Sequence, residues 1–206
     1  MQFEGIKALY AHGFEGGPKG RKARYLSDTL GFDLCAPTLY ARGWSLETHV
    51  DVIYDALVSE PEIRYVIGSS MGGLASLLAA KRLSKRPLRL LLCAPAFGIH
   101  RSWRHRLGES VFKEWKCRGV MSYPHAGLNR PIELPYQFWI ECRDAMPAEV
   151  LHPTAIIHGR RDDVVSIEES RLVASAFPDL VQLFEVDDDH RLGLSLDLFA
   201  DALSGL

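Results

Sequence analysis

Short apolar segments alternate along the chain with longer segments in which apolar residues recur at helical spacing. The short segments are IKALYAH, FDLCAP, IRYVIGS, LRLLLCAP, TAIIHG and LVQLFEV, and each predicts a strand. The longer segments predict helices over residues 19–30, 45–58, 71–83, 166–177 and 194–203. Strands that alternate with helices in this way predict an α/β fold, with about six mainly parallel strands flanked by helices on both faces.

The alternation stops between LRLLLCAP and TAIIHG, where residues from about 98 to 146 separate two predicted strands. A connection of this length inside a compact domain has structure of its own. Apolar residues recur within it every four positions, at Trp103, Leu107, Val111 and Trp115, which predicts one continuous helical face. We therefore expect a single domain over residues 1–206 with a small helical insertion at about 98–146.

Composition and charge are compatible with one globular domain. The chain has 206 residues, 47% of them hydrophobic, and a formal charge of -2, so no general attraction for nucleic acid is expected. The longest apolar run is too short to span a membrane, and the first residues lack the pattern of a signal peptide. We expect a soluble, cytoplasmic protein, a monomer or a small homo-oligomer, with no nucleic-acid partner and no membrane span.

The cysteines and acidic residues do not indicate a metal or cofactor site. Four cysteines are spread along the chain without a C-x-x-C pair, which predicts free thiols: Cys35, Cys93, Cys117 and Cys142. The acidic run at 187–189 has no histidine or glutamate pair at ligand spacing and predicts solvated loop residues. The sequence thus implies no metal and no organic cofactor.

The segment GSSMG at 68–72 fits the pattern G-x-S-x-G with Ser70 at its centre. It follows a predicted strand and precedes a predicted helix, which is the setting of a nucleophile elbow. Gly68 and Gly72 remove side chains that would collide where strand and helix converge. Ser69 lacks a glycine two positions before it, because Ile67 stands there. Ser70 is therefore the predicted nucleophile, and the alternative is a glycine-rich turn whose serines only cap the helix.

A serine hydroxyl needs a base to take its proton, usually a histidine that a carboxylate orients. Asp162 and Asp163 follow the strand TAIIHG, and His190 follows the strand LVQLFEV. Because the carboxyl ends of parallel strands meet at one edge of a sheet, we expect His190 and one aspartate to lie near Ser70. Asp162 is favoured, since it comes three residues after Gly159 and the following valines turn back into the core, but Asp163 stays open.

The glycine-rich loop HGFEGGPKG after the first predicted strand lets backbone N–H groups approach a developing negative charge. The amide of Phe14 is one predicted oxyanion donor, and the amide of Met71, directly after the nucleophile, is the other. A phosphate loop is disfavoured because no Gly-Lys-Ser/Thr ends the segment. His12 and His158 are interpreted as structural residues that brace their loops.

Together, HGF, GSSMGG, HGRRDDVV and DDDHRL resemble the α/β-hydrolase superfamily in the correct order over nearly the whole chain. The opening LYAHGFEGGPKGRKARYL is similar to that of small bacterial serine esterases of the YqiA type. The resemblance implies six strands in the spatial order 2-1-3-4-5-6, a cap or lid at about 98–146, and a triad of Ser70, Asp162 and His190. It does not settle the substrate, because this superfamily hosts many activities.

The sequence thus predicts a serine hydrolase that cleaves small-molecule carboxylic esters of small or medium acyl groups through an acyl-enzyme. Three tryptophans of the insertion either pack on the hydrolase core or roof an acyl pocket, where they would bind substrate: Trp103, Trp115 and Trp139. Basic residues around them are either solvated or meet an anionic part of the substrate: Arg101, Arg104, Arg106, Lys113, Lys116 and Arg118. The alternatives are an acyl thioesterase on coenzyme A or protein thioesters, and a hydrolase-like binding module without turnover.

Overall fold

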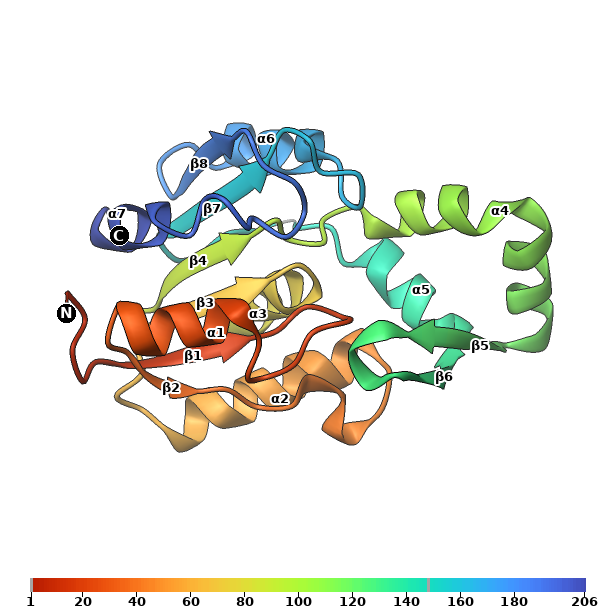
Figure 1. Ribbon diagram of the computed structural model, residues 1–206, viewed down its shortest axis with the longest axis horizontal. Coiled ribbons are helices and arrows are strands. Elements are labelled where there is room, and N and C mark those ends of the chain that lie inside the picture. The colour runs from red at the N-terminus through yellow and green to blue at the C-terminus, as the bar shows by residue number, and fades with distance from the viewer. Residues whose placement is uncertain (1, 148) are drawn as a thin grey trace.

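A computed structural model describes residues 2–147 and 149–206 (Figure 1). Its main element is a six-stranded sheet in the order β2-β1-β3-β4-β7-β8, in which every neighbouring pair is parallel. The strands are β1 (Lys7–Ala11), β2 (Asp33–Cys35), β3 (Tyr65–Ser69), β4 (Arg89–Cys93), β7 (Thr154–Gly159) and β8 (Val181–Val186). Counted among themselves, these strands have the spatial order 2-1-3-4-5-6 that the resemblance implied.

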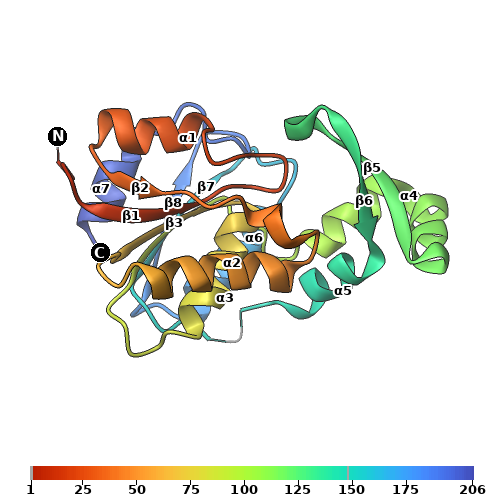
Figure 2. The ribbon, with the colours of Figure 1, turned by 90° about the horizontal axis from the view of Figure 1, so that it is seen from below.

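Helices cover both faces of the sheet (Figure 2). One face carries α2 (Leu46–Ser59), α3 (Met71–Lys81) and α6 (Ile167–Ala176), and the other carries α1 (Arg21–Arg24), the π-helix η1 (Tyr25–Thr29) and α7 (Leu198–Ser204). Leu9 of β1 belongs to the core on the first face, and its neighbours Ala8 and Tyr10 belong to the core on the second. Because both faces are buried, the strands read as continuous apolar runs, which is why the sequence pattern predicts them correctly.

The predicted helices are all present, and their ends differ for local reasons. Helix α2 begins next to Ser45, whose hydroxyl accepts a hydrogen bond from the Thr48 amide at 3.4 Å and so caps the helix. A short 3-10 turn, η2 (Leu39–Arg42), precedes it. The predicted helix 19–30 is divided into α1 and η1, and the predicted helix 194–203 begins only at Leu198.

The insertion is not purely helical, so that expectation was wrong in part. It consists of α4 (Ile99–Arg118), β5 (Val120–His125), the 3-10 turn η3 (Ala126–Leu128), β6 (Arg130–Pro135) and α5 (Tyr136–Asp144). Strands β5 and β6 form a two-stranded antiparallel hairpin in which Pro124 stands opposite Pro131. Both strands of such a hairpin have a free edge, which tolerates proline. Because proline within a segment argues against a strand, the sequence pattern did not predict these two.

The continuous helical face predicted through Val111 is also wrong. Helix α4 is broken at Gly108, whose φ of 77° and ψ of 157° are not helical. Glycine adopts a positive φ without the steric cost that a side chain would bring. Beyond the break the helix presents another face to the core, so Phe112 is buried while Val111 is 45% exposed.

The insertion lies beyond the carboxyl ends of the strands and is attached to the domain there (Figure 1). Its buried aromatic residues belong to the same core as helices α2 and α3. On α5, Oε2 of Glu141 accepts hydrogen bonds from the Ser45 hydroxyl at 2.9 Å and the Leu46 amide at 2.7 Å. A carboxylate at this position accepts hydrogen bonds from unpaired amides at the start of α2, and its negative charge interacts favourably with the helix dipole.

Candidate active site

Ser70 occupies the tip of the turn between β3 and α3. Its φ of 53° and ψ of -117° lie in a region that residues other than glycine rarely adopt. The Ser70 amide donates to the Cys93 carbonyl at 2.9 Å, and the Ser70 carbonyl accepts from the Ala96 amide at 3.0 Å. The adjacent strand and the chain that follows it therefore hold the strained turn in place.

The two glycines around Ser70 are required by a close crossing of strand and helix. A Cβ at Gly68 would lie 2.6 Å from the carbonyl oxygen of Gly72 and the Cα of Gly73. A Cβ at Gly72 would overlap the carbonyl oxygens of Ala11 and His12. No side chain fits at either position, as the sequence pattern indicated.

The structure brings Ser70, His190 and Asp162 into one hydrogen-bonded series. Oδ2 of Asp162 lies 2.7 Å from Nδ1 of His190, and Nε2 of the same ring lies 3.0 Å from Oγ of Ser70. A carboxylate can only accept, so the imidazole donates from Nδ1 and, when neutral, accepts the serine proton at Nε2. Asp163 is exposed, whereas the Asp162 side chain is 0% exposed. This arrangement is the one that general-base activation of a serine requires.

The Asp162 carboxylate is fully hydrogen-bonded. Oδ1 accepts hydrogen bonds from the amides of Val164 and Val165, both at 2.8 Å. Besides its bond from His190, Oδ2 accepts a hydrogen bond from Nε2 of His158 at 3.0 Å. Burial alone would raise the pKa of Asp162, but the hydrogen bonds from His158 and His190 outweigh it and hold this pKa well below its ordinary value. The group therefore stays charged across the physiological range.

Asp188 organises the loop that carries His190, so the prediction that it is a solvated residue was wrong. Asp188 is 3% exposed. Its carboxylate accepts from the amides of Asp189 and Leu194 at 2.8 and 2.7 Å and from the Ser195 hydroxyl at 2.9 Å. Because Asp188 stands in a run of three aspartates, its role in ordering this loop was not predicted. The one signal in the sequence was Ser195, whose hydroxyl could bond a buried carboxylate.

The predicted oxyanion donors belong to two segments that lie next to Ser70. Met71 begins α3, and the Phe14 loop passes close to the nucleophile, since a Cβ at Gly13 would lie 3.3 Å from Cβ of Ser70. Within the described part of the chain, neither the Phe14 amide nor the Met71 amide donates to a protein acceptor. The absence of a protein acceptor is compatible with the predicted role of both N–H groups as oxyanion donors, and that role stays a prediction.

His49 of α2 lines a narrow crevice together with Phe14, Tyr40 and Met71. His49 is 2% exposed, and neither ring nitrogen has a hydrogen-bond partner among residues 2–147 and 149–206. Burial lowers the pKa of His49 from 6.5 to about 4. The folded protein therefore holds a neutral imidazole here at pH values where the unfolded chain is protonated.

This lowered pKa predicts a specific loss of stability in acid. Because only the unfolded state binds the proton between pH 6.5 and about 4, the His49 contribution is complete above 6.5 and lost as the pH falls to 4. From the shift of pKa we expect a loss of about 3 kcal/mol over this interval. In urea unfolding at pH 7.5 and 4.5, His49→Phe should reduce the difference between the two values by most of that amount. His105→Phe, at an exposed histidine, is the control, and an unchanged difference in His49→Phe would contradict the prediction.

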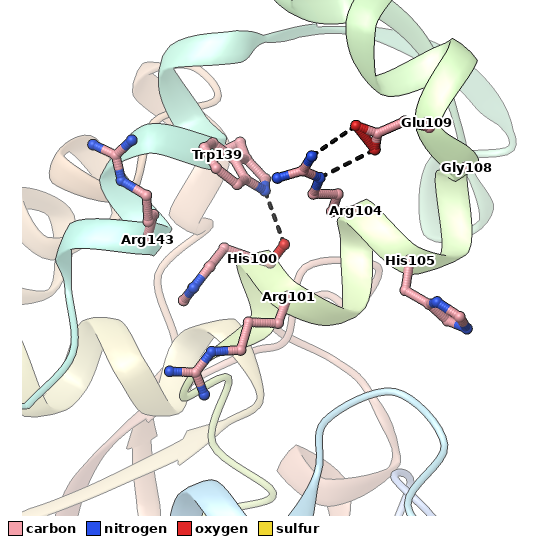
Figure 3. Close-up of a pocket in the computed structure, with 8 residues that line it drawn as sticks. All are labelled: His100, Arg101, Arg104, His105, Gly108, Glu109, Trp139 and Arg143. Atoms are coloured by element: carbon pink, nitrogen blue, oxygen red, sulfur yellow. Dashed lines mark hydrogen bonds and ion pairs between the residues drawn. The ribbon is translucent and has the colours of Figure 1, made fainter.

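The three tryptophans of the insertion lie in different surroundings. Trp103 contacts Phe14, with 5.4 Å between ring centroids. Trp115 is 1% exposed and donates from Nε1 to the Leu134 carbonyl at 2.9 Å, so it is a core residue of the insertion. Trp139 donates from Nε1 to the His100 carbonyl at 2.9 Å (Figure 3). Their predicted contact with substrate stays a prediction.

An open cavity of about 730 Å³ lies between α4 and α5, and none of Ser70, His190 and Asp162 lines it. It is lined by His100, Arg101, Arg104, His105, Gly108, Glu109, Trp139 and Arg143 (Figure 3). Its arginines form the ion pairs Arg101–Glu169, Arg104–Glu109 and Arg143–Asp144. Each guanidinium therefore already holds a carboxylate, and the predicted contact of these basic groups with an anionic substrate stays a prediction.

The described residues contain neither a cluster of metal ligands nor a helix that could span a membrane. In that part of the chain, no group of three or more His, Cys, Asp or Glu side chains is arranged to hold a metal ion. None of the described helices combines the length and the apolar character needed to cross a bilayer. All four cysteines are free thiols, as predicted.

The chain matches one family model and is similar in sequence to a set of curated proteins. Residues 7–199 match UPF0227, an uncharacterised protein family. The chain is also 29% identical over 154 residues to palmitoyl-protein thioesterase ABHD10, mitochondrial, of Rattus norvegicus, a match that covers 71% of this chain and 51% of that protein. The Mus musculus protein of the same name is 28% identical over 154 residues. The chain thus spans about half the length of the curated relatives it matches.

Solved structures with the same fold include mouse alpha/beta hydrolase domain-containing protein 10, with a TM-score of 0.74 and 20% identity over 100% of this chain and 90% of that chain. Est1E from Butyrivibrio proteoclasticus has a TM-score of 0.74 and 19% identity, covering 98% and 87% of the two chains. A monoacylglycerol lipase of Paleococcus ferrophilus has a TM-score of 0.68 and 16% identity, covering 98% and 96%. These likenesses show the α/β-hydrolase fold that the sequence predicted.

Proposed function

Since the chain belongs to the UPF0227 family, an uncharacterised protein family, we propose its function from the candidate site. The proposed function is that of a serine hydrolase, which cleaves carboxylic esters of small or medium acyl groups through an acyl-enzyme. The observation that carries the proposal is the series from Ser70 through His190 to Asp162, with contacts of 3.0 and 2.7 Å. The α/β-hydrolase fold and the hydrolase names of the relatives support it.

In the proposed reaction, Nε2 of His190 takes the proton of Ser70 as Oγ attacks the ester carbonyl. The carbonyl oxygen becomes an oxyanion, to which the amides of Phe14 and Met71 donate hydrogen bonds. His190 then gives its proton to the leaving alkoxide, and the acyl group stays on Ser70. Asp162 keeps the imidazole proton on Nδ1 throughout and stabilises the imidazolium.

In the second half of the reaction, His190 activates a water molecule that attacks the acyl-enzyme. The same two amides stabilise the second tetrahedral intermediate, and its collapse returns the proton to Ser70. The catalytic groups in these steps are side chains and backbone amides of the chain, and water is the co-reactant. We propose that the insertion at 98–146 acts as the cap over this site, with Trp103 above the Phe14 loop.

A second candidate is an acyl thioesterase, which the names of the ABHD10 relatives favour. The same serine, base and oxyanion donors serve a thioester, because only the leaving group differs. The word mitochondrial in those names applies to those proteins, and the cytoplasmic location of this chain stays a prediction. A monomer or small homo-oligomer likewise stays a prediction.

The test is a panel of 4-nitrophenyl esters and acyl thioesters matched in acyl length from two to sixteen carbons. We expect at least one short or medium ester to be cleaved with kcat/KM above about 10⁴ M⁻¹ s⁻¹, the lower range for enzymes. A thioester preference above about 100-fold at equal acyl length, more than 2.7 kcal/mol of barrier, would support the thioesterase instead. Thermal stabilisation by these compounds without turnover would leave the binding module as the better description.

A further inference from the structure

The tip of the β5–β6 hairpin holds the loop that carries Phe14. The Leu128 amide donates to Nδ1 of His125 at 3.1 Å. A neutral imidazole that accepts at one nitrogen carries its proton on the other, so Nε2–H donates to the Phe14 carbonyl oxygen at 2.8 Å. His125 is 2% exposed, so this bond is shielded from competition by water.

A second imidazole holds the preceding carbonyl of the same loop. The Leu39 amide donates to Nε2 of His12 at 3.1 Å, so Nδ1–H donates to the Gly13 carbonyl oxygen at 2.8 Å. Burial lowers the pKa of His12, which keeps this ring neutral. The Gly13 carbonyl and the Phe14 N–H belong to one planar peptide unit, and the Phe14 carbonyl belongs to the next. The two imidazoles thus hold both peptide planes that meet at Phe14, and with them the direction of its N–H.

Other contacts keep the hairpin tip against the loop. The Tyr123 hydroxyl donates to Oε1 of Glu15 at 2.8 Å. A Cβ at Gly127 would overlap the Glu15 carbonyl oxygen, so the two backbones approach as closely as glycine permits. The Phe14 ring packs between insertion residues, with centroids 5.5 Å from both Tyr123 and Phe138.

We propose that His125 is a positioning residue, which from the insertion orients the Phe14 peptide so that the oxyanion hole is complete only while the hairpin tip lies against the loop. The inference rests on the proposed function, because it takes Phe14 as an oxyanion donor. Without the bond to His125, the peptide plane that follows Phe14 can rotate, so Phe14 is fixed on one side only and the direction of its N–H depends on the His12 bond alone. Transition-state stabilisation then falls, while the surface that binds the ester stays in place.

The test is a pair of substitutions that separate the two nitrogens of His125. In His125→Gln, the side-chain amide reaches the position of Nε2 and can donate to the Phe14 carbonyl. In His125→Asn, the shorter side chain reaches only the position of Nδ1, so the Phe14 carbonyl loses its partner. We expect His125→Asn to lower kcat about 10- to 100-fold, up to the effect of losing a whole oxyanion donor, with KM changed less than about 3-fold. His125→Gln should restore kcat to within about 3-fold. The Ki of a trifluoromethyl ketone should rise in His125→Asn as kcat/KM falls.

His152 provides the matched control, because it is 4% exposed and bonds a backbone carbonyl, that of Ala80, at 2.9 Å. His152→Asn should keep the wild-type kcat. If His125→Asn does not fold, Gly127→Ala, at an exposed position, displaces the tip and should show the same loss of kcat. Equal losses in His125→Asn and His125→Gln, or wild-type kcat in the first, would overturn the inference. If these results came together with an inactive Ser70→Ala variant, only the role of His125 would be wrong. If Ser70→Ala were active, the proposed function itself would be wrong.

Discussion

Ser70→Ala is expected to lower kcat for every ester that the wild-type protein cleaves by about 10⁴-fold or more. The substitution removes Oγ, the atom on which the acyl-enzyme forms, and leaves His190 without the hydroxyl that lies 3.0 Å from its Nε2. The fold should persist, because the Ser70 contacts to β4 and the following chain are made by its backbone. The measurements are kcat with 4-nitrophenyl esters and covalent labelling by a fluorophosphonate, and both should be lost.

Ser69→Ala is the matched control, one residue away in the same turn. Ser69 ends β3, is 7% exposed and pairs with Cys93 in the sheet register, so its side chain belongs to the strand and not to the tip. We expect its kcat and its labelling to stay within about 3-fold of wild type, as for a substitution outside the reacting groups. Labelling that survives Ser70→Ala, or disappears in Ser69→Ala, would show that the nucleophile has been assigned to the wrong residue.

Asp162→Asn is expected to lower kcat by about 10²- to 10⁴-fold. The amide lacks the negative charge that stabilises the imidazolium, and its N–H₂ group turned toward His190 would favour the wrong tautomer. The residue also accepts from His158 at 3.0 Å, so the same change disturbs a second buried imidazole. Because the pKa of Asp162 is held well below its ordinary value, protonation of this carboxylate does not account for a loss of activity near neutral pH.

Asp163→Asn separates the role of Asp162 from general loss of acidic charge in this loop. Asp163 is exposed, so we expect kcat and the melting temperature of this variant to match wild type. Measuring both variants at one pH, with circular dichroism to confirm folding, decides between the two aspartates. A larger loss in Asp163→Asn than in Asp162→Asn would transfer the role of the acid to Asp163.

Much of the fold and of the candidate site was predictable because it depends on local patterns. Continuous apolar runs predict strands buried on both faces, and their alternation with helices predicts the parallel order. Parallel strands bring their carboxyl ends to one edge, so residues that follow different strands, such as Ser70 and His190, could be expected to meet there. Gly68 and Gly72 signalled the sharp turn because no side chain fits where strand and helix cross.

The insertion and the role of Asp188 were predicted less well, and each error has its own cause. The four-residue spacing from Trp103 to Trp115 assumes an unbroken helix, but a glycine can leave the helical conformation at little cost, and Gly108 does so. The β5–β6 hairpin was not predicted because its strands contain prolines, which are tolerated only on free edges. The role of Asp188 was missed since an acidic run looks solvated, while burial depends on the whole loop.

The sequence by itself determined the order of the six sheet strands and their flanking helices, the nucleophile turn around Ser70 and the candidate base His190, because each depends on periodicity or on residues within a short segment. Only the tertiary structure decided that Asp162 and not Asp163 reaches His190, that Trp103 alone of three tryptophans contacts Phe14, and that His125 bonds the Phe14 carbonyl. These contacts join residues far apart in the chain. Their distances depend on how a break such as Gly108 redirects the backbone, which no local pattern records.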